Sequence, residues 1–169
     1  MGKFVLIFVA SLTTLFGIEL LQPVQTHVVL PWTKLLAHTC VALVSLFDGS
    51  ALAHGKVLWN PANGFGVSIE AGCNGMEAFI VLSAALLAFP SKWRVKLLGL
   101  VTGFVAIQLL NVIRVISLFY LGQWNKDWFN FAHSYLWQGL IMLDVLAVWL
   151  VWVRYASPPR QRRPMACVT

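Results

Sequence analysis

The chain has 169 residues, of which 59% are hydrophobic and only 11% are charged. Soluble domains carry about a quarter charged residues, so this composition excludes an ordinary soluble domain and indicates a membrane protein. The net charge of +6 would also suit a nucleic-acid-binding protein, but the basic residues stand in short clusters at the ends of apolar runs, as in membrane proteins. We therefore expect the lipid bilayer, and no nucleic acid, as a partner.

Four apolar runs are long enough to be considered as membrane-spanning helices, which take about 20 residues each. The first covers residues 4–21. We expect it to be retained as a span because no small-x-small cleavage site follows it; a cleaved secretory signal is the alternative. The other runs are the one that follows Cys73 as far as Phe89, residues 97–121 and residues 131–153. The predicted fold class is an all-α polytopic membrane protein with about four transmembrane helices.

Two further elements are predicted between the first and second of these runs. Residues 35–47 are apolar but number only 13, which as a helix would cover about 20 Å. That is too short for an unaided crossing, so we predict an interfacial or re-entrant helix; a full span there would invert the downstream topology. In the polar stretch that follows, the strand-like runs 56–59 and 65–70 flank a turn at 60–64 and predict a small extracytoplasmic β-hairpin.

The basic residues orient the spans. With both ends of the chain in the cytoplasm, eight lysines and arginines lie inside and three lie outside, as the positive-inside rule requires. The inner eight are Lys3, Lys92, Arg94, Lys96, Arg154, Arg160, Arg162 and Arg163, and the outer three are Lys34, Lys56 and Lys126. Residues 1–154 then form a single membrane-embedded domain, and residues 155–169 a basic, proline-rich cytoplasmic tail that we expect to be disordered.

Three side chains that lipid disfavours stand in apolar surroundings: Cys73, Arg114 and His133. The helical rise of about 1.5 Å per residue places them roughly 28, 26 and 32 Å from the basic cluster of their own span. Because the hydrocarbon core is about 30 Å thick, all three are predicted to lie near its outer boundary, on three different spans. A thiol, a guanidinium and an imidazole at one depth suggest a nucleophile, an anion stabiliser and a proton carrier in one site.

Each of the three also has a structural explanation. A membrane cysteine often only packs, and an arginine near the boundary can reach the lipid headgroups. Arg114, however, shares a helix face with Asn111 and Gln108, which indicates a polar stripe that points inward.

The proton carrier has rivals among the other histidines. His133 is preferred because a helix holds it at the same depth as Cys73 and Arg114. Its structural explanation is that of an ordinary histidine at the membrane interface. The alternatives are His27, His38 and His54. Two acids also lie in apolar segments: Glu77 could pair with Arg114 or orient the base, and Asp144 could make an interior hydrogen bond.

No cofactor or metal is predicted. The three cysteines, Cys40, Cys73 and Cys167, share no CxxC spacing, which disfavours a dithiol oxidoreductase and a disulfide scaffold. Zinc held by Cys73, His133 and another histidine is a weak alternative, because no ligand spacing supports it.

The pattern resembles the exosortase/archaeosortase family, membrane-embedded cysteine transpeptidases that process C-terminal sorting signals. The resemblance covers about residues 55–145, and the short chain is similar to the compact bacterial form called exosortase H. The family's usual cysteine motif reads Ala-Cys-Ser-Gly, so residues 72 and 74 depart from it. The matching motifs are Gly72-Cys73-Asn74-Gly75 at a helix start, Asn111-Val112-Ile113-Arg114 late in the next span, and His133 with Gly139 in the last.

The resemblance implies Cys73 as the nucleophile, Arg114 as the stabiliser of the substrate carbonyl or oxyanion, and His133 as the general acid/base. Asn74, Glu77 and Asn111 are predicted to support them. Substrates would be exported proteins that end in a short motif, a transmembrane helix and a basic tail. Cleavage would take place at the outer face of the bacterial inner membrane, through a thioester that passes to an unknown amine acceptor or to water.

Two other functional classes stay open. A non-catalytic small transporter or membrane-assembly subunit would use Arg114, Glu77 and Asp144 to line a polar path. A cysteine peptidase that works on the cytoplasmic side would require the inverted topology.

Overall fold

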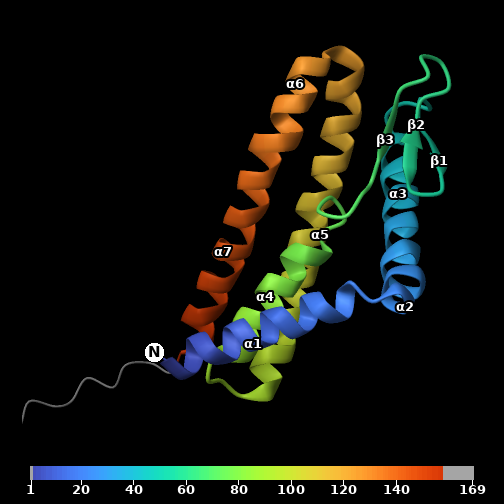
Figure 1. The fold of residues 1–169 in the computed structure, drawn as a ribbon. Helices are drawn as coiled ribbons and strands as arrows, with labels where there is room; N and C mark the ends of the chain where they lie inside the picture. Colours follow the sequence, from blue (N-terminus) through green and yellow to red (C-terminus); the bar gives the residue numbers. More distant parts are fainter. Residues whose placement is uncertain (1, 158–169) are drawn as a thin grey trace, which may run out of the picture.

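The longest helices form an antiparallel pair in the computed structural model, which describes residues 2–157 (Figure 1). Helix α5 (Trp93–Trp124) runs the length of the molecule, and the chain returns through α6 (Lys126–Phe131), the π-helical segment η2 (Ala132–Leu136) and α7 (Trp137–Ala156). The reversal is set by Asn125, whose side chain caps α6 by accepting hydrogen bonds from the N–H groups of Asp127 and Trp128.

Four helical segments are long and apolar enough to cross a membrane: Gly2–Glu19 (α1), Gln22–Val44, Trp93–Trp124 and Lys126–Ala156. The predicted all-α polytopic fold with about four candidate spans is therefore confirmed, and the protein is a multi-pass membrane protein. One of the four candidate spans differs from the prediction. Gln22–Val44 is long enough to cross a membrane, whereas the helix that follows Cys73 is too short to be counted among them.

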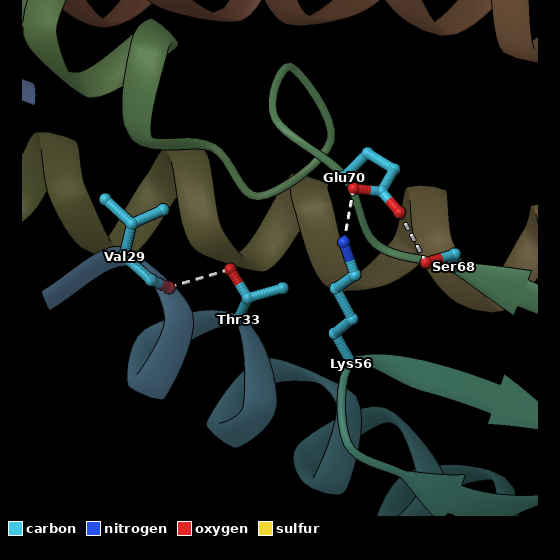
Figure 2. A network of polar contacts seen from close by, with 5 residues as sticks. All are labelled: Val29, Thr33, Lys56, Ser68 and Glu70. Carbon is cyan, nitrogen blue, oxygen red and sulfur yellow. Dashed lines mark hydrogen bonds and ion pairs between the residues drawn. The ribbon is translucent and has the colours of Figure 1, made fainter. Parts of the chain in front are cut away.

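The short interfacial helix predicted at 35–47 has the wrong bounds. The structure has one continuous helical segment of 23 residues, made of α2 (Gln22–Val24), η1 (Gln25–Val29) and α3 (Leu30–Val44). Pro31 lacks the N–H that a regular helix needs, and a widened π turn precedes it, closed by a hydrogen bond from Leu30 N–H to the Gln25 carbonyl. One turn further, the Thr33 hydroxyl donates to the Val29 carbonyl at 2.8 Å (Figure 2).

The helix behind Cys73 is shorter than predicted. Helix α4 covers only Met76–Ala88, about 20 Å, because the glycines at 72 and 75 adopt left-handed backbone conformations with φ of +81° and +75° and delay its start. It lies along the lower half of α5 and α7 in Figure 1, and α1 crosses its other side. Buried apolar side chains of α4, α5 and α7 join in one core: Ala78, Leu82, Leu86, Ile107, Ile141, Val145 and Trp152.

The predicted hairpin is part of a three-stranded antiparallel sheet. Strands β2 (Val57–Trp59) and β3 (Gly66–Ser68) form the expected hairpin, and β1 (Leu52–His54), which the sequence did not indicate, pairs with the other edge of β2. The order β1-β2-β3 leaves β3 as an edge strand. The sheet packs against α3 and α5 through a second core of buried side chains that includes Leu36, Cys40, Leu58, Val67, Ile69 and Phe119.

Helix α5 contributes to both cores, so it fixes the sheet and the α4–α7 layer relative to one another. The sheet lies towards the α6 end of the bundle, opposite the end where α5 begins with its basic cluster (Figure 1). Helix α7 continues to Ala156, two residues past the predicted domain boundary. The rest of the predicted disordered tail, residues 158–169, lies outside the described residues.

Candidate active site

Cys73 lies in a tight turn between β3 and α4. Its N–H donates to the Glu70 carbonyl at 2.9 Å, and the N–H of Gly72 donates to the Glu77 carboxylate in the first turn of α4. A Cβ at Gly75 would come within 2.8 Å of the Gln108 amide, so position 75 requires glycine for space as well as for its left-handed backbone. The cysteine was expected to open the helix, but it stands three residues before it.

Asn74 attaches this turn to two other helices. Its side-chain oxygen accepts from the Met76 N–H at 2.9 Å, and its carbonyl lies 3.3 Å from the Trp32 indole nitrogen and 3.4 Å from the Gln108 amide nitrogen, both of which donate to it. The residue is 1% exposed. Asn74 thus connects the loop that carries the cysteine to α3 and α5, and its supporting role in the site stays a prediction.

Arg114 reaches the turn from α5 and is only 2% exposed. Its Nη1 donates to the Gly72 carbonyl at 3.1 Å and its Nη2 to the Cys73 sulfur at 3.3 Å. In the described part of the chain the only ion pair is Lys56–Glu70 on the surface, so no carboxylate neutralises this guanidinium. A buried cation without a counter-ion is costly, and here it lies against a thiol. The alternative in which Arg114 extends to the lipid headgroups is not what the structure shows.

His133 also contacts this sulfur. Its Nε2 lies 3.5 Å from Cys73 Sγ. The ring stacks on Phe129 with a centroid distance of 5.7 Å and an interplanar angle of 15°, which fixes its orientation. The residue belongs to the π-helical segment η2, and such widened turns within helices frequently occur at functional sites.

The three side chains face one small cavity of about 100 Å³. Its walls are the β3 segment, the Cys73 turn, α5, and the residues Phe129 and His133 before α7. The full set of lining residues is Gly66, Val67, Ser68, Ile69, Cys73, Arg114, Val115, Leu118, Phe129 and His133. A thiol, a guanidinium and an imidazole therefore share one cavity, as we predicted from the similar depth of the three residues. Their catalytic roles stay predictions.

The surroundings of Cys73 raise the pKa of its thiol. Burial raises the pKa of Cys73 above its ordinary value of 9.0, the charge of Arg114 opposes this rise, and the negative charges of Glu77 and Glu70 add to it. A raised pKa favours the protonated thiol at neutral pH, so a reaction at this sulfur would require a base.

The supporting residues fall into two groups. Glu77 neither pairs with Arg114 nor orients His133; it holds the backbone of the Cys73 turn. Asn111 is fully buried, and neither atom of its amide has a hydrogen-bond partner among residues 2–157, so its supporting role stays a prediction.

Two neighbours of the site could not be identified from the sequence. Trp32 and Phe129 hold Asn74 and His133, but aromatic residues are common near membrane boundaries. The rival histidines His27 and His54 lie on η1 and β1, and His27 bonds locally to Thr26 and Pro23.

We expect the rate of alkylation of Cys73 by iodoacetamide to rise with pH, with a midpoint above the usual pKa of a cysteine thiol. The rate is measured in a variant whose other cysteines, Cys40 and Cys167, are alanine. Glu77→Gln removes a charge that raises the pKa of Cys73, so the midpoint of the rate profile should move to lower pH. Arg114→Met removes the charge that lowers this pKa, so the midpoint should move to higher pH. Shifts in the same direction in both variants would contradict this electrostatic account.

In a comparison with protein families, the family described as transmembrane exosortase (Exosortase_EpsH) matches residues 3–153. The match includes all the residues that line the cavity. No curated protein and no solved structure matches the chain.

Proposed function

The chain belongs to the transmembrane exosortase family, and from that premise we propose that it is a membrane-embedded cysteine peptidase or transpeptidase that acts through a thioester on Cys73. The observation that carries the proposal is the contact of one sulfur with both Arg114 and His133 inside one cavity. A buried guanidinium without a counter-ion supports it further, because a fixed cation in a site of low dielectric stabilises negative charge that develops during a reaction.

The chemistry begins with proton transfer from the Cys73 thiol to His133 Nε2, 3.5 Å away. The thiolate attacks the carbonyl carbon of the scissile peptide, and the charge that moves to the carbonyl oxygen is stabilised by Arg114. The tetrahedral intermediate collapses, the C–N bond breaks, and the proton on His133 passes to the leaving amine. An amine acceptor or water, deprotonated by His133, then attacks the thioester and releases Cys73.

The substrates in this proposal are exported proteins with a C-terminal motif, a transmembrane helix and a basic tail, and the acceptor is an amine of unknown identity. The location is the bacterial inner membrane, with Cys73 on the extracytoplasmic side. This side is supported by the positions of the basic cluster and the sheet at opposite ends of the helix bundle. The basic cluster lies where α5 begins, whereas the sheet lies at the α6 end (Figure 1). The excess of basic residues at the first of these ends favours the cytoplasm there.

The proposal is tested by trapping the thioester. The reporter is an epitope-tagged exported protein from the same genome that ends in a short motif, an apolar helix and a basic tail. We expect a covalent adduct between the enzyme and the tagged fragment, which hydroxylamine removes because it cleaves thioesters, and which is absent from a Cys73→Ala variant.

The matched control is Cys40→Ala, which removes a thiol that is buried between α3 and the sheet, away from the cavity. This variant should retain the adduct. An adduct of the same yield in Cys73→Ala would contradict the proposal.

A further inference from the structure

We propose that the free edge of β3 binds the substrate as an added β-strand, with the backbone of Gly66 and Ser68 pairing with the peptide that carries the scissile bond. The proposal rests on the proposed function and specifies how the same cavity would hold its substrate. The ligand class is an extended polypeptide that is recognised through its main chain.

The pairing within the sheet decides which backbone groups of β3 are available. The Asn60 N–H donates to the Phe65 carbonyl and the Ile69 N–H donates to the Lys56 carbonyl, so residues 65 and 69 direct their backbone groups towards β2. Backbone groups alternate in direction along an antiparallel strand, so Val67 also faces β2. The N–H and C=O groups of Gly66 and Ser68 therefore point outward from the free edge.

These four backbone groups have no partner within residues 2–157. Neither Gly66 nor Ser68 takes part in a backbone hydrogen bond outside the strands, and no side chain bonds to their backbone atoms. Both residues are exposed, whereas the intervening Val67 is buried in the core beneath the sheet. An unpaired strand edge is a ready template for another strand.

The edge lies in the reactive cavity. Gly66 and Ser68 line it together with Cys73, Arg114 and His133. A strand paired with β3 would run through the cavity, so its carbonyl groups would pass the sulfur. Main-chain hydrogen bonds would supply affinity with little dependence on sequence, and side-chain pockets would supply the choice of motif.

A polar network holds this edge and the cysteine turn in a fixed relation (Figure 2). The Ser68 hydroxyl donates to Glu70 at 2.7 Å, and the Lys56 ammonium donates to the other oxygen of the same carboxylate. The Glu70 carbonyl in turn accepts from the Cys73 N–H. The strand that would receive the peptide is thus linked to the nucleophile through a single residue.

The test removes one outward N–H with Ser68→Pro. Proline is tolerated on edge strands because the missing N–H faces away from the sheet. We expect processing of the reporter to fall about tenfold or more, through the lost hydrogen bond and the clash of the ring with the incoming strand. Ser68→Ala keeps the N–H and loses only the hydroxyl bond to Glu70, so its loss of processing should be smaller than that of Ser68→Pro.

Ala53→Pro is the matched control on the opposite edge of the same sheet. Because Leu58 bonds to β3, its neighbours Val57 and Trp59 bond to β1, which leaves the N–H of Ala53 outward. This variant should process the reporter normally. Equal processing by Ser68→Pro and Ala53→Pro, in a system where Cys73→Ala abolishes processing, would overturn the strand proposal and leave the proposed function intact.

A second measurement does not depend on the proline variant folding. In a Cys73→Ala background, a benzophenone amino acid at position 68 should crosslink to the reporter on illumination, and the same group at position 53 should not. Crosslinking from both positions alike, or from neither, would overturn the proposal. Side chains stand perpendicular to a sheet, so the probe at position 68 leaves the edge itself free.

Discussion

Cys73→Ala abolishes processing of the reporter while the protein still accumulates in the membrane. The expected fall is on the order of 10⁴- to 10⁶-fold, the range seen when the nucleophile of a peptidase is removed. Cys73→Ser should also be inactive, because a serine hydroxyl at this position has no group that makes it as acidic as a thiol. The measurement is the ratio of cleaved to uncleaved reporter over time.

Cys40→Ala again provides the control for removal of a thiol. It creates a small cavity in the core beneath the sheet, with a cost of about 1 kcal/mol in the free energy of unfolding, and leaves the reactive cavity unchanged. Normal processing by Cys73→Ala would contradict the enzyme proposal. The transporter or assembly alternative predicts that outcome: Cys73→Ser would be silent, and changes at Arg114 and Asp144 would abolish function.

The meeting of Cys73, Arg114 and His133 could be anticipated because helical geometry turns sequence distance into depth. Each residue lies a similar number of residues from a basic cluster, and the rise per residue of a helix is nearly constant. The result tolerates errors in the helix bounds: α4 begins three residues after Cys73, yet the turn before it keeps the sulfur at the level of Arg114.

The helix through residues 22–44 could not be predicted from hydropathy alone. Pro31 and the polar residues around it interrupt the apolar run in the sequence, and the widened turn at 25–29 shows how the backbone continues past the proline. Strand β1 was missed for another reason: its three residues lack an alternating pattern, and pairing with β2 defines it.

The contacts that hold the site depend on tertiary packing. Trp32 reaches Asn74 across 42 positions of sequence, and Gln108 reaches the same carbonyl across 34. Glu77 was expected to serve the reactive groups, but its position in the first turn of α4 places its carboxylate at the Gly72 N–H. Spacing along a helix indicates which residues share a face, but it does not identify the backbone group that each side chain meets.

Arg114→Lys lowers processing by about 10²- to 10³-fold, equivalent to about 3–4 kcal/mol of transition-state stabilisation. Lysine keeps the positive charge, but one ammonium on a shorter side chain does not reproduce the planar fork that bonds the Gly72 carbonyl through Nη1 and the sulfur through Nη2. The loss should appear in kcat, because the carbonyl oxygen gains its charge only in the transition state.

Arg154→Lys, at an exposed position near the end of α7, is the matched control and should leave processing unchanged. Iodoacetamide should still alkylate Cys73 in Arg114→Lys, which separates a loss of catalysis from a collapse of the turn. Processing by Arg114→Lys within about threefold of the wild type would mean that a charge at this position is enough. The two-point contact of the guanidinium would then serve to hold the cysteine turn, and the oxyanion would need another donor.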